Sequence, residues 1–124
     1  MTVLADTSIW IDHFRRSDLQ LSQLLERGDI VMHPFIIGEL LLGHVPKIAE
    51  MIDDLNVLPK AIVASADEIL SFISARKLPG SGIGYVDAHL LAAAALTPET
   101  TVWTRDKRLQ AAARSLSLAA EFPE

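Results

Sequence analysis

The chain contains no cysteine, which excludes a disulfide framework and thiolate metal sites and fits a reducing compartment. The opening residues MTVLADTS lack the basic and apolar regions of a signal peptide. The longest unbroken apolar run is LLAAAAL at 90–96, whereas crossing a bilayer takes ~20 residues. We therefore expect a soluble, cytoplasmic protein with no membrane association.

The chain also lacks an excess of positive charge. It has 11 Lys and Arg against 16 Asp and Glu, a formal net charge of -5. This balance argues against a general phosphate-binding surface, unless several carboxylates share bound divalent cations. With 124 residues, 50% hydrophobic and 22% charged, the chain predicts one domain, residues 1–124, with a substantial core.

Hydrophobic periodicity predicts short strands that alternate with longer helices, and no internal repeat is present. Strands are predicted at residues 2–6, 29–33, 56–59, 100–106 and 117–122. Helices are predicted at 8–14, 18–28, 34–43, 46–55, 65–77, 85–96 and 107–116. Ser8 is the expected N-cap of the first helix, and Gly28 is expected to end the second, whose Leu19, Leu21, Leu24 and Leu25 should face inward. This alternation predicts a three-layer α/β/α fold around a central, mainly parallel sheet of four to five short strands.

Four acidic residues from distant parts of the chain fall near one predicted edge of this sheet. Asp6 and Asp106 end the first and a late strand, and Asp87 lies in the first turn of the apolar helix 85–96. Glu39 lies on the helix that follows the second strand. Sites in open α/β sheets form outside the carboxyl ends of the strands, so the four carboxylates are expected to converge there.

Each acid also has a purely structural interpretation. Asp6 suits the end of a strand in a turn, Asp106 suits the cap of the following helix, and Asp87 suits a helix N-terminus. Glu39 lies within the apolar run IIGELLLG, where it would be either a surface residue on a polar stripe or a carboxylate pointing into the cluster. A buried carboxylate needs a compensating partner.

A converged quartet would require a cation, because like charges at close range raise one another's pKa. Oxygen ligands without His or Cys suit a hard ion such as Mg²⁺ or Mn²⁺. Such an ion activates water and polarises phosphate, which is the usual equipment for phosphoryl chemistry.

Three segments carry a family resemblance: LADTSIWIDHF, GIGYVDAHLLAAA and VWTRDKRL. Together they resemble PIN-domain ribonucleases, especially the VapC toxins of bacterial toxin–antitoxin pairs, over essentially the whole chain. The resemblance implies a metal site made by Asp6, Glu39, Asp87 and Asp106, supported by the hydroxyls of Ser8 and Thr104. It further implies an Mg²⁺- or Mn²⁺-dependent endoribonuclease that uses metal-activated water, a homodimer, and inhibition by a cognate VapB-like antitoxin.

Other side chains have weaker functional interpretations. Basic residues flank the acids and are candidate RNA contacts, although solvated surface charge is the simpler interpretation: Arg15, Arg16, Arg105, Lys107 and Arg108. Trp10 and Phe14, four residues apart, belong to the core or an interface and are candidates to line a partner groove. The four histidines lack metal-ligand spacing, and GSGIG at 80–84 lacks the phosphate-loop pattern.

Three alternatives remain open from the sequence. One is a PIN-fold RNA-processing nuclease without an antitoxin, and another is a PIN-fold binding module without catalysis. The third is a phospho-receiver signalling domain, which Thr104 and Lys107 would suit. The acidic pair that a receiver needs near the end of its first strand is missing.

Overall fold

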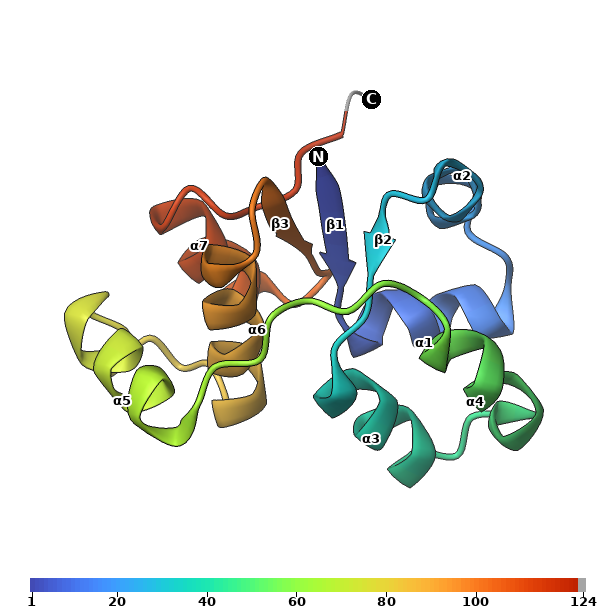
Figure 1. Ribbon diagram of the computed structural model, residues 1–124, viewed down its shortest axis with the longest axis horizontal. Coiled ribbons are helices and arrows are strands. Elements are labelled where there is room, and N and C mark those ends of the chain that lie inside the picture. Colours follow the sequence, from blue (N-terminus) through green and yellow to red (C-terminus); the bar gives the residue numbers. More distant parts are fainter. Residues whose placement is uncertain (123–124) are drawn as a thin grey trace.

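A computed structural model describes residues 1–122, which fold around a parallel sheet with helices beside it (Figure 1). The sheet contains β1 (Thr2–Ala5), β2 (Ile30–Val31) and β3 (Thr100–Trp103) in the order β2-β1-β3. Val3 pairs with Ile30 on one side and with Thr101 on the other. The predicted α/β fold with a parallel sheet is therefore confirmed.

The two outer strands expected at 56–59 and 117–122 are reduced to single parallel bridges, Met32 to Lys60 and Val102 to Ala119. Met32 donates its N–H to the carbonyl of Pro59 at 2.7 Å, and Val102 donates to Leu118 at 2.7 Å. On the first edge a longer strand cannot form, because helix α4 extends through Asn56 and Pro59 has no N–H.

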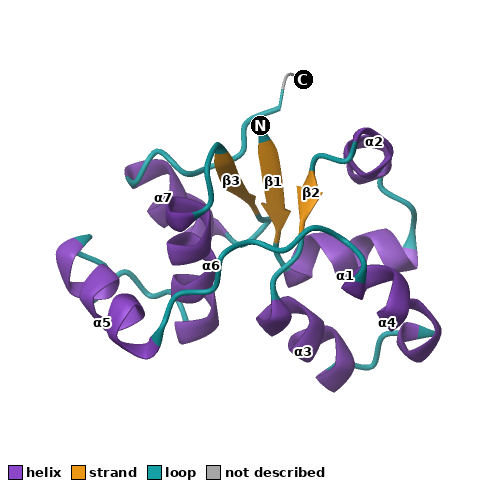
Figure 2. Ribbon diagram, viewed as in Figure 1, coloured by secondary structure: helices purple, strands orange, loops and turns teal. Residues whose placement is uncertain are grey.

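Helices account for most of the ordered elements (Figure 2). They are α1 (Thr7–Arg15), α2 (Leu19–Arg27), α3 (Pro34–Leu42), α4 (Ile48–Asn56), α5 (Ala66–Ala75), α6 (Tyr85–Leu96) and α7 (Lys107–Ser115). Figure 1 shows α5, α6 and α7 grouped next to β3, and α1 to α4 grouped on the β2 side.

The first two helices confirm one detail of the prediction and correct two others. Asp6, not Ser8, is the N-cap of α1, and its side chain accepts the Ile9 N–H. Gly28 ends α2 as predicted, with a left-handed φ of 74° that favours glycine. Leu19, predicted to face inward, is 73% exposed because it occupies the first position of α2 and points away from the core.

The core explains why α6 is apolar on nearly every side. Residues Ala88–Ala94 of this helix are all buried, and they contribute to hydrophobic clusters on both sides of it. Leu90 packs with β1, while Leu91 packs with Val102 of β3 and with α7. Within residues 1–122, no helix combines the length and apolar composition that crossing a bilayer requires.

Candidate active site

The carboxyl ends of β1 and β3 bring the first and last acids of the predicted quartet to one edge of the sheet. Asp6 directly follows β1, and its N–H donates to the carbonyl of Trp103, the last residue of β3, at 2.9 Å. Asp106 follows three residues later and caps α7 by accepting the Leu109 N–H at 2.9 Å. The structural and functional interpretations of both residues therefore coexist.

Asp6 is the most tightly held carboxylate of the four. It is 6% exposed, and its two oxygens accept hydrogen bonds of 2.5 Å from the hydroxyls of Ser8 and Thr104. Burial raises the pKa of the Asp6 carboxyl above its ordinary value, and the Ser8 and Thr104 hydroxyls offset part of that effect. The carboxylate is therefore desolvated, well oriented and receptive to a cation.

Backbone N–H groups from the β3–α7 connection orient the two supporting hydroxyls in turn. The Arg105 N–H donates to Ser8 Oγ at 3.3 Å, and the Asp106 N–H donates to Thr104 Oγ1 at 3.0 Å. Each hydroxyl accepts from the backbone and donates to Asp6, which fixes the direction of its proton. The network thus links residues that lie almost the whole chain apart.

Glu39 is a surface residue, which is one of the two interpretations that the sequence left open. Its side chain is exposed, and its Oε1 accepts a 2.6 Å hydrogen bond from the Thr7 hydroxyl. The neighbours Leu41 and Leu42 are themselves 52% and 88% exposed, so this end of α3 is a partly apolar surface. Thr7 follows Asp6 directly, so the hydrogen bond holds Glu39 beside the carboxyl end of β1.

Asp87 shows that the four carboxylates influence one another. Burial raises the pKa of Asp87 above its ordinary value, and the nearby charges of Asp6, Asp106 and Glu39 raise it further. A hydrogen bond from the Gly84 backbone opposes these effects in part. The charges of Asp6, Glu39 and Asp106 therefore act on Asp87, while the convergence of the four carboxylates into one metal site stays a prediction.

The donor set suits a hard divalent ion, because the four side chains offer only carboxylate oxygens and repel one another. As the side chains stand, no group of three or more His, Asp or Glu among residues 1–122 is arranged to hold a metal ion. Glu39 is hydrogen-bonded to Thr7, and Asp106 is engaged in capping α7. The site thus has the chemistry for a metal, while direct ligation requires these side chains to reorient.

The five basic candidates differ sharply in what they contact. Arg105 donates to Asp12 at 2.6 Å and to Asp18 at 2.8 Å, so both ends of its guanidinium are paired. The pKa of Arg105 is raised by its hydrogen bonds to Asp18 and Asp12, which outweigh its partial burial. By contrast, the ion pairs of residues 1–122 include none from the other four, which are exposed: Arg15, Arg16, Lys107 and Arg108.

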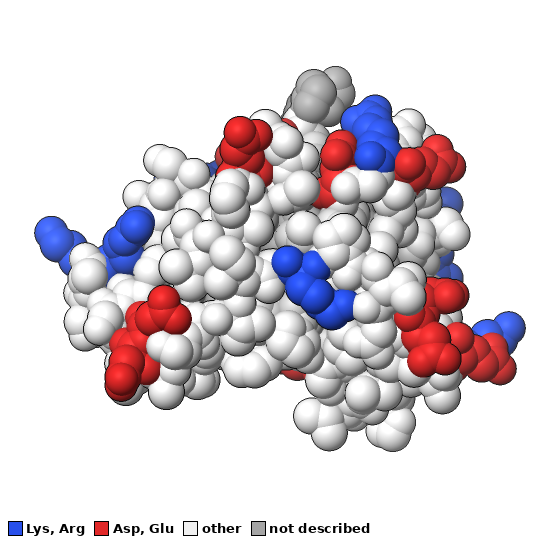
Figure 3. All heavy atoms as spheres, in the orientation of Figure 1, with Lys and Arg blue, Asp and Glu red and all other residues white. Residues whose placement is uncertain are grey.

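Charge on the face drawn in Figure 3 is dispersed, with acidic and basic side chains scattered over a largely neutral surface. This face offers no continuous basic surface for RNA, in keeping with the net charge of -5.

Trp10 and Phe14 lie on α1 with their rings 5.9 Å apart. Trp10 is buried in the core, whereas Phe14 is only partly buried. Both line a pocket of about 230 Å³ that is bounded by α2 and α4. The core interpretation therefore holds for Trp10, and the pair also borders a hollow.

Two groups were not anticipated from the sequence. Thr7 holds Glu39, and the only available signal was the run of two hydroxyl residues after Asp6. Buried His33 and His89 lie next to the site with ring centroids 6.3 Å apart. His33 caps α3 through Nδ1, and burial lowers its pKa to about 4.

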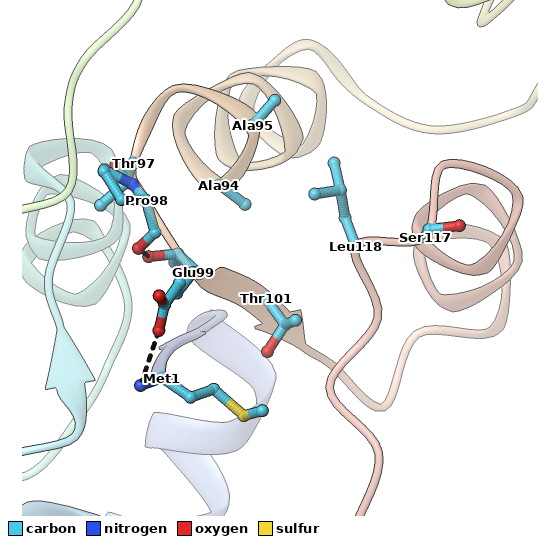
Figure 4. Close-up of a pocket in the computed structure, with 10 residues that line it drawn as sticks. Met1, Ala94, Ala95, Thr97, Pro98, Glu99, Thr101, Ser117 and Leu118 are labelled. Atoms are coloured by element: carbon cyan, nitrogen blue, oxygen red, sulfur yellow. Dashed lines mark hydrogen bonds and ion pairs between the residues drawn. The ribbon is translucent and has the colours of Figure 1, made fainter.

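A separate pocket of about 450 Å³ lies at the opposite edge of the sheet, where β1 and β3 begin (Figure 4). There the amino group of Met1 pairs with Glu99 at 3.6 Å. None of the four acids lines this pocket. The chemistry-bearing groups therefore gather at the carboxyl edge, as expected for a parallel sheet.

Comparison with known proteins agrees with this arrangement. Residues 3–115 match the PIN domain family. The chain is 41% identical over 117 residues to Ribonuclease VapC32 from two strains of Mycobacterium tuberculosis, CDC 1551 / Oshkosh and ATCC 25618 / H37Rv, covering 94% of each chain. The crystal structure of PAE2754 from Pyrobaculum aerophilum is similar in fold, with a TM-score of 0.60, 16% identity, and coverage of 93% of this chain and 81% of that one.

The match to the family model spans most of the chain, and the relatives align over nearly their full length. This result removes the phospho-receiver alternative. The chain belongs to the PIN-domain family, in its VapC branch, as the resemblance of its sequence motifs indicated.

Proposed function

We propose that this protein is a metal-dependent endoribonuclease that acts as the toxin of a toxin–antitoxin pair. The observation that carries the proposal is the place of Asp6 and Asp106 after the carboxyl ends of β1 and β3, with Glu39 hydrogen-bonded to Thr7 next to Asp6. The similarity to Ribonuclease VapC32 supports RNA as the substrate. Action on cellular RNA would place the protein in the cytoplasm.

The four carboxylates would hold Mg²⁺ or Mn²⁺, which lowers the pKa of an attacking water and polarises the scissile phosphate. Asp6 is pre-oriented for this role by the Ser8 and Thr104 hydroxyls. Asp106 is the N-cap of α7 and Asp87 lies in the first turn of α6, so both stand at helix N-termini, and turning the Asp106 side chain towards an ion would give up its hydrogen bond from the Leu109 N–H. Glu39, held by Thr7 on the solvent side, is positioned to ligate directly or to orient the water.

Two further properties belong to the proposal. A VapB-like antitoxin is the proposed inhibitor, and the hollow bordered by Trp10 and Phe14 is the proposed place for part of it. Homodimerisation is proposed because Leu41 and Leu42 leave apolar surface at the end of α3 for a second copy. An antitoxin gene next to the toxin gene would separate this proposal from an RNA-processing nuclease without an antitoxin.

The decisive test is cleavage of a labelled RNA pool by purified protein that is free of any bound partner. We expect cleavage with Mg²⁺ or Mn²⁺, none with EDTA, and a loss of at least about 100-fold in Asp6→Asn and Glu39→Gln. Matched controls are Asp53→Asn and Glu50→Gln, which neutralise exposed acids on α4 and should cleave normally. Full activity of Glu39→Gln would remove Glu39 from the site, and absence of cleavage by folded, metal-loaded wild type would favour a binding module.

A further inference from the structure

The cluster of acids creates a problem for any RNA substrate, because four carboxylates repel the phosphate that must approach them. Arg105 and Lys107 flank Asp106 in sequence, and Asp12 and Asp18 already engage the guanidinium of Arg105. A phosphate contact close to the site must therefore come from another cation.

Arg108 meets this requirement through an unusual contact with a glycine. It is the second residue of α7, two positions after the cap residue Asp106. Its side chain lies against Gly82 in the 79–84 loop, which leads into α6 and Asp87. A Cβ atom added to Gly82 would lie 3.0 Å from Arg108 Cδ, 3.4 Å from Nε and 3.5 Å from Nη1.

The guanidinium of Arg108 is exposed and is not neutralised by a carboxylate of residues 1–122. The hydrogen bonds and ion pairs within residues 1–122 include none from its side chain. Its forked donors are therefore free for a phosphate, which arginine binds in bidentate geometry.

We infer that Gly82 positions Arg108 as a phosphate-binding residue beside the acidic cluster, an inference that rests on the proposed ribonuclease function. The φ of Gly82 is 84°, which favours glycine. Because Gly82 has no Cβ atom, the Arg108 side chain has room to lie against it from Cδ to Nη1. The contact joins the loop before Asp87 to the helix that begins at Asp106. RNA binding would thus depend on the same two segments that supply half of the carboxylates.

The loop contains its own control. Gly80 has a φ of 81°, almost the same as Gly82, but a Cβ atom added there would meet nothing within 4 Å. Alanine at either position carries a similar backbone penalty, because both residues have a left-handed φ that favours glycine. Only alanine at 82 also displaces Arg108.

The experiment measures binding of a fluorescein-labelled single-stranded RNA pool in EDTA, where no cleavage occurs, across a series of KCl concentrations. We expect Arg108→Gln to weaken binding about 10-fold and to reduce the slope of log K against log salt by roughly 0.7, the value for one phosphate contact on a single strand. Gly82→Ala should match that loss and that slope, and the double variant should be no weaker than Arg108→Gln. Gly80→Ala should bind like the wild type, with thermal melts confirming that all variants fold.

Equal losses in Gly80→Ala and Gly82→Ala would overturn the inference, as would an unchanged salt slope in Arg108→Gln. Cleavage by the wild type separates this inference from the proposed function. A wild type that cuts RNA while Arg108→Gln keeps the wild-type salt slope would refute the inference alone. A wild type that binds RNA through Arg108 but never cuts it would refute the nuclease alone.

Discussion

The two halves of the acidic cluster are held in different ways. Asp6 and Asp106 follow adjacent parallel strands, and the register of β1 against β3 brings them to the same edge of the sheet. Glu39 and Asp87 come from helices α3 and α6, whose packing sets their distance from the strands. Asp6 is buried and hydrogen-bonded at both oxygens, whereas Glu39 is exposed and bonded to one hydroxyl.

This difference indicates how the site would respond to a metal ion. Asp6 provides buried, hydrogen-bonded oxygens, whereas Asp106 and Glu39 are exposed and can adjust their side chains around the ion. Burial is the main cause of the raised pKa of Asp87, and the charges of Asp6, Asp106 and Glu39 raise it further; a divalent cation would relieve this repulsion. The predictions below test the strand half first and then the helix half.

The largest effect is expected from the hydroxyl that orients Asp6. Thr104→Val keeps the shape of the side chain but removes its 2.5 Å hydrogen bond to Asp6, and it should lower metal affinity and cleavage by about 10–100-fold. Isothermal titration with Mn²⁺ and RNA cleavage would measure the two losses. Thr101→Val is the matched control, because the Thr101 hydroxyl is buried and has no partner among the described residues. Equal losses in the two variants would contradict the orienting role of Thr104.

A pH effect is expected in the helix half, because buried His33 caps α3, the helix that carries Glu39. Its pKa is about 4 in the folded protein and 6.5 when unperturbed, so between these values the unfolded chain binds the extra proton. This contribution to stability is complete above pH 6.5 and declines as the pH falls towards 4, by up to about 1.4 kcal/mol per pH unit.

Urea unfolding between pH 7 and pH 4 would measure this dependence. His33→Asn retains an acceptor for the Phe35 N–H but cannot titrate, so its stability should fall less steeply than that of the wild type. Identical slopes for the two proteins would show that His33 does not carry the effect.

A smaller effect, on the order of 1 kcal/mol, is expected from relieving the repulsion at Asp87. Since folding raises the pKa of this carboxyl, its ionised form costs stability at pH values above the folded pKa. Asp87→Asn should therefore raise the melting temperature at pH 7 in EDTA. It should also abolish cleavage, because it removes a proposed metal ligand. Below pH 3.8 the carboxyl is protonated in both states, and the gain should disappear.

Mg²⁺ provides the complementary measurement for Asp87. The ion should raise the melting temperature of the wild type more than that of Asp87→Asn, because it offsets a repulsion that the variant lacks. A variant that is less stable than the wild type in EDTA would show that the Gly84 hydrogen bond outweighs the repulsion.

Much of the fold followed from local patterns. The predicted helix 85–96 coincides with α6 (Tyr85–Leu96), because a long apolar segment between a glycine and a threonine leaves little choice of boundary. The strand predicted at 56–59 does not form, because Asn56 belongs to α4 and because Pro59 lacks the N–H group that a parallel edge strand would use. Leu19 was misplaced because the apolar pattern of α2 does not show where the first turn leaves the core.

The sequence specified which acids the protein has and which of them follow strands, and parallel strands bring their carboxyl ends to one edge. It did not specify how each side chain is engaged there. Arg105 pairs with Asp12 and Asp18, which lie 93 and 87 residues away in sequence. Glu39 accepts a hydrogen bond from Thr7 at the surface, and the Arg108 side chain lies against Gly82. These contacts depend on distances between elements that are remote along the chain, and packing alone sets those distances.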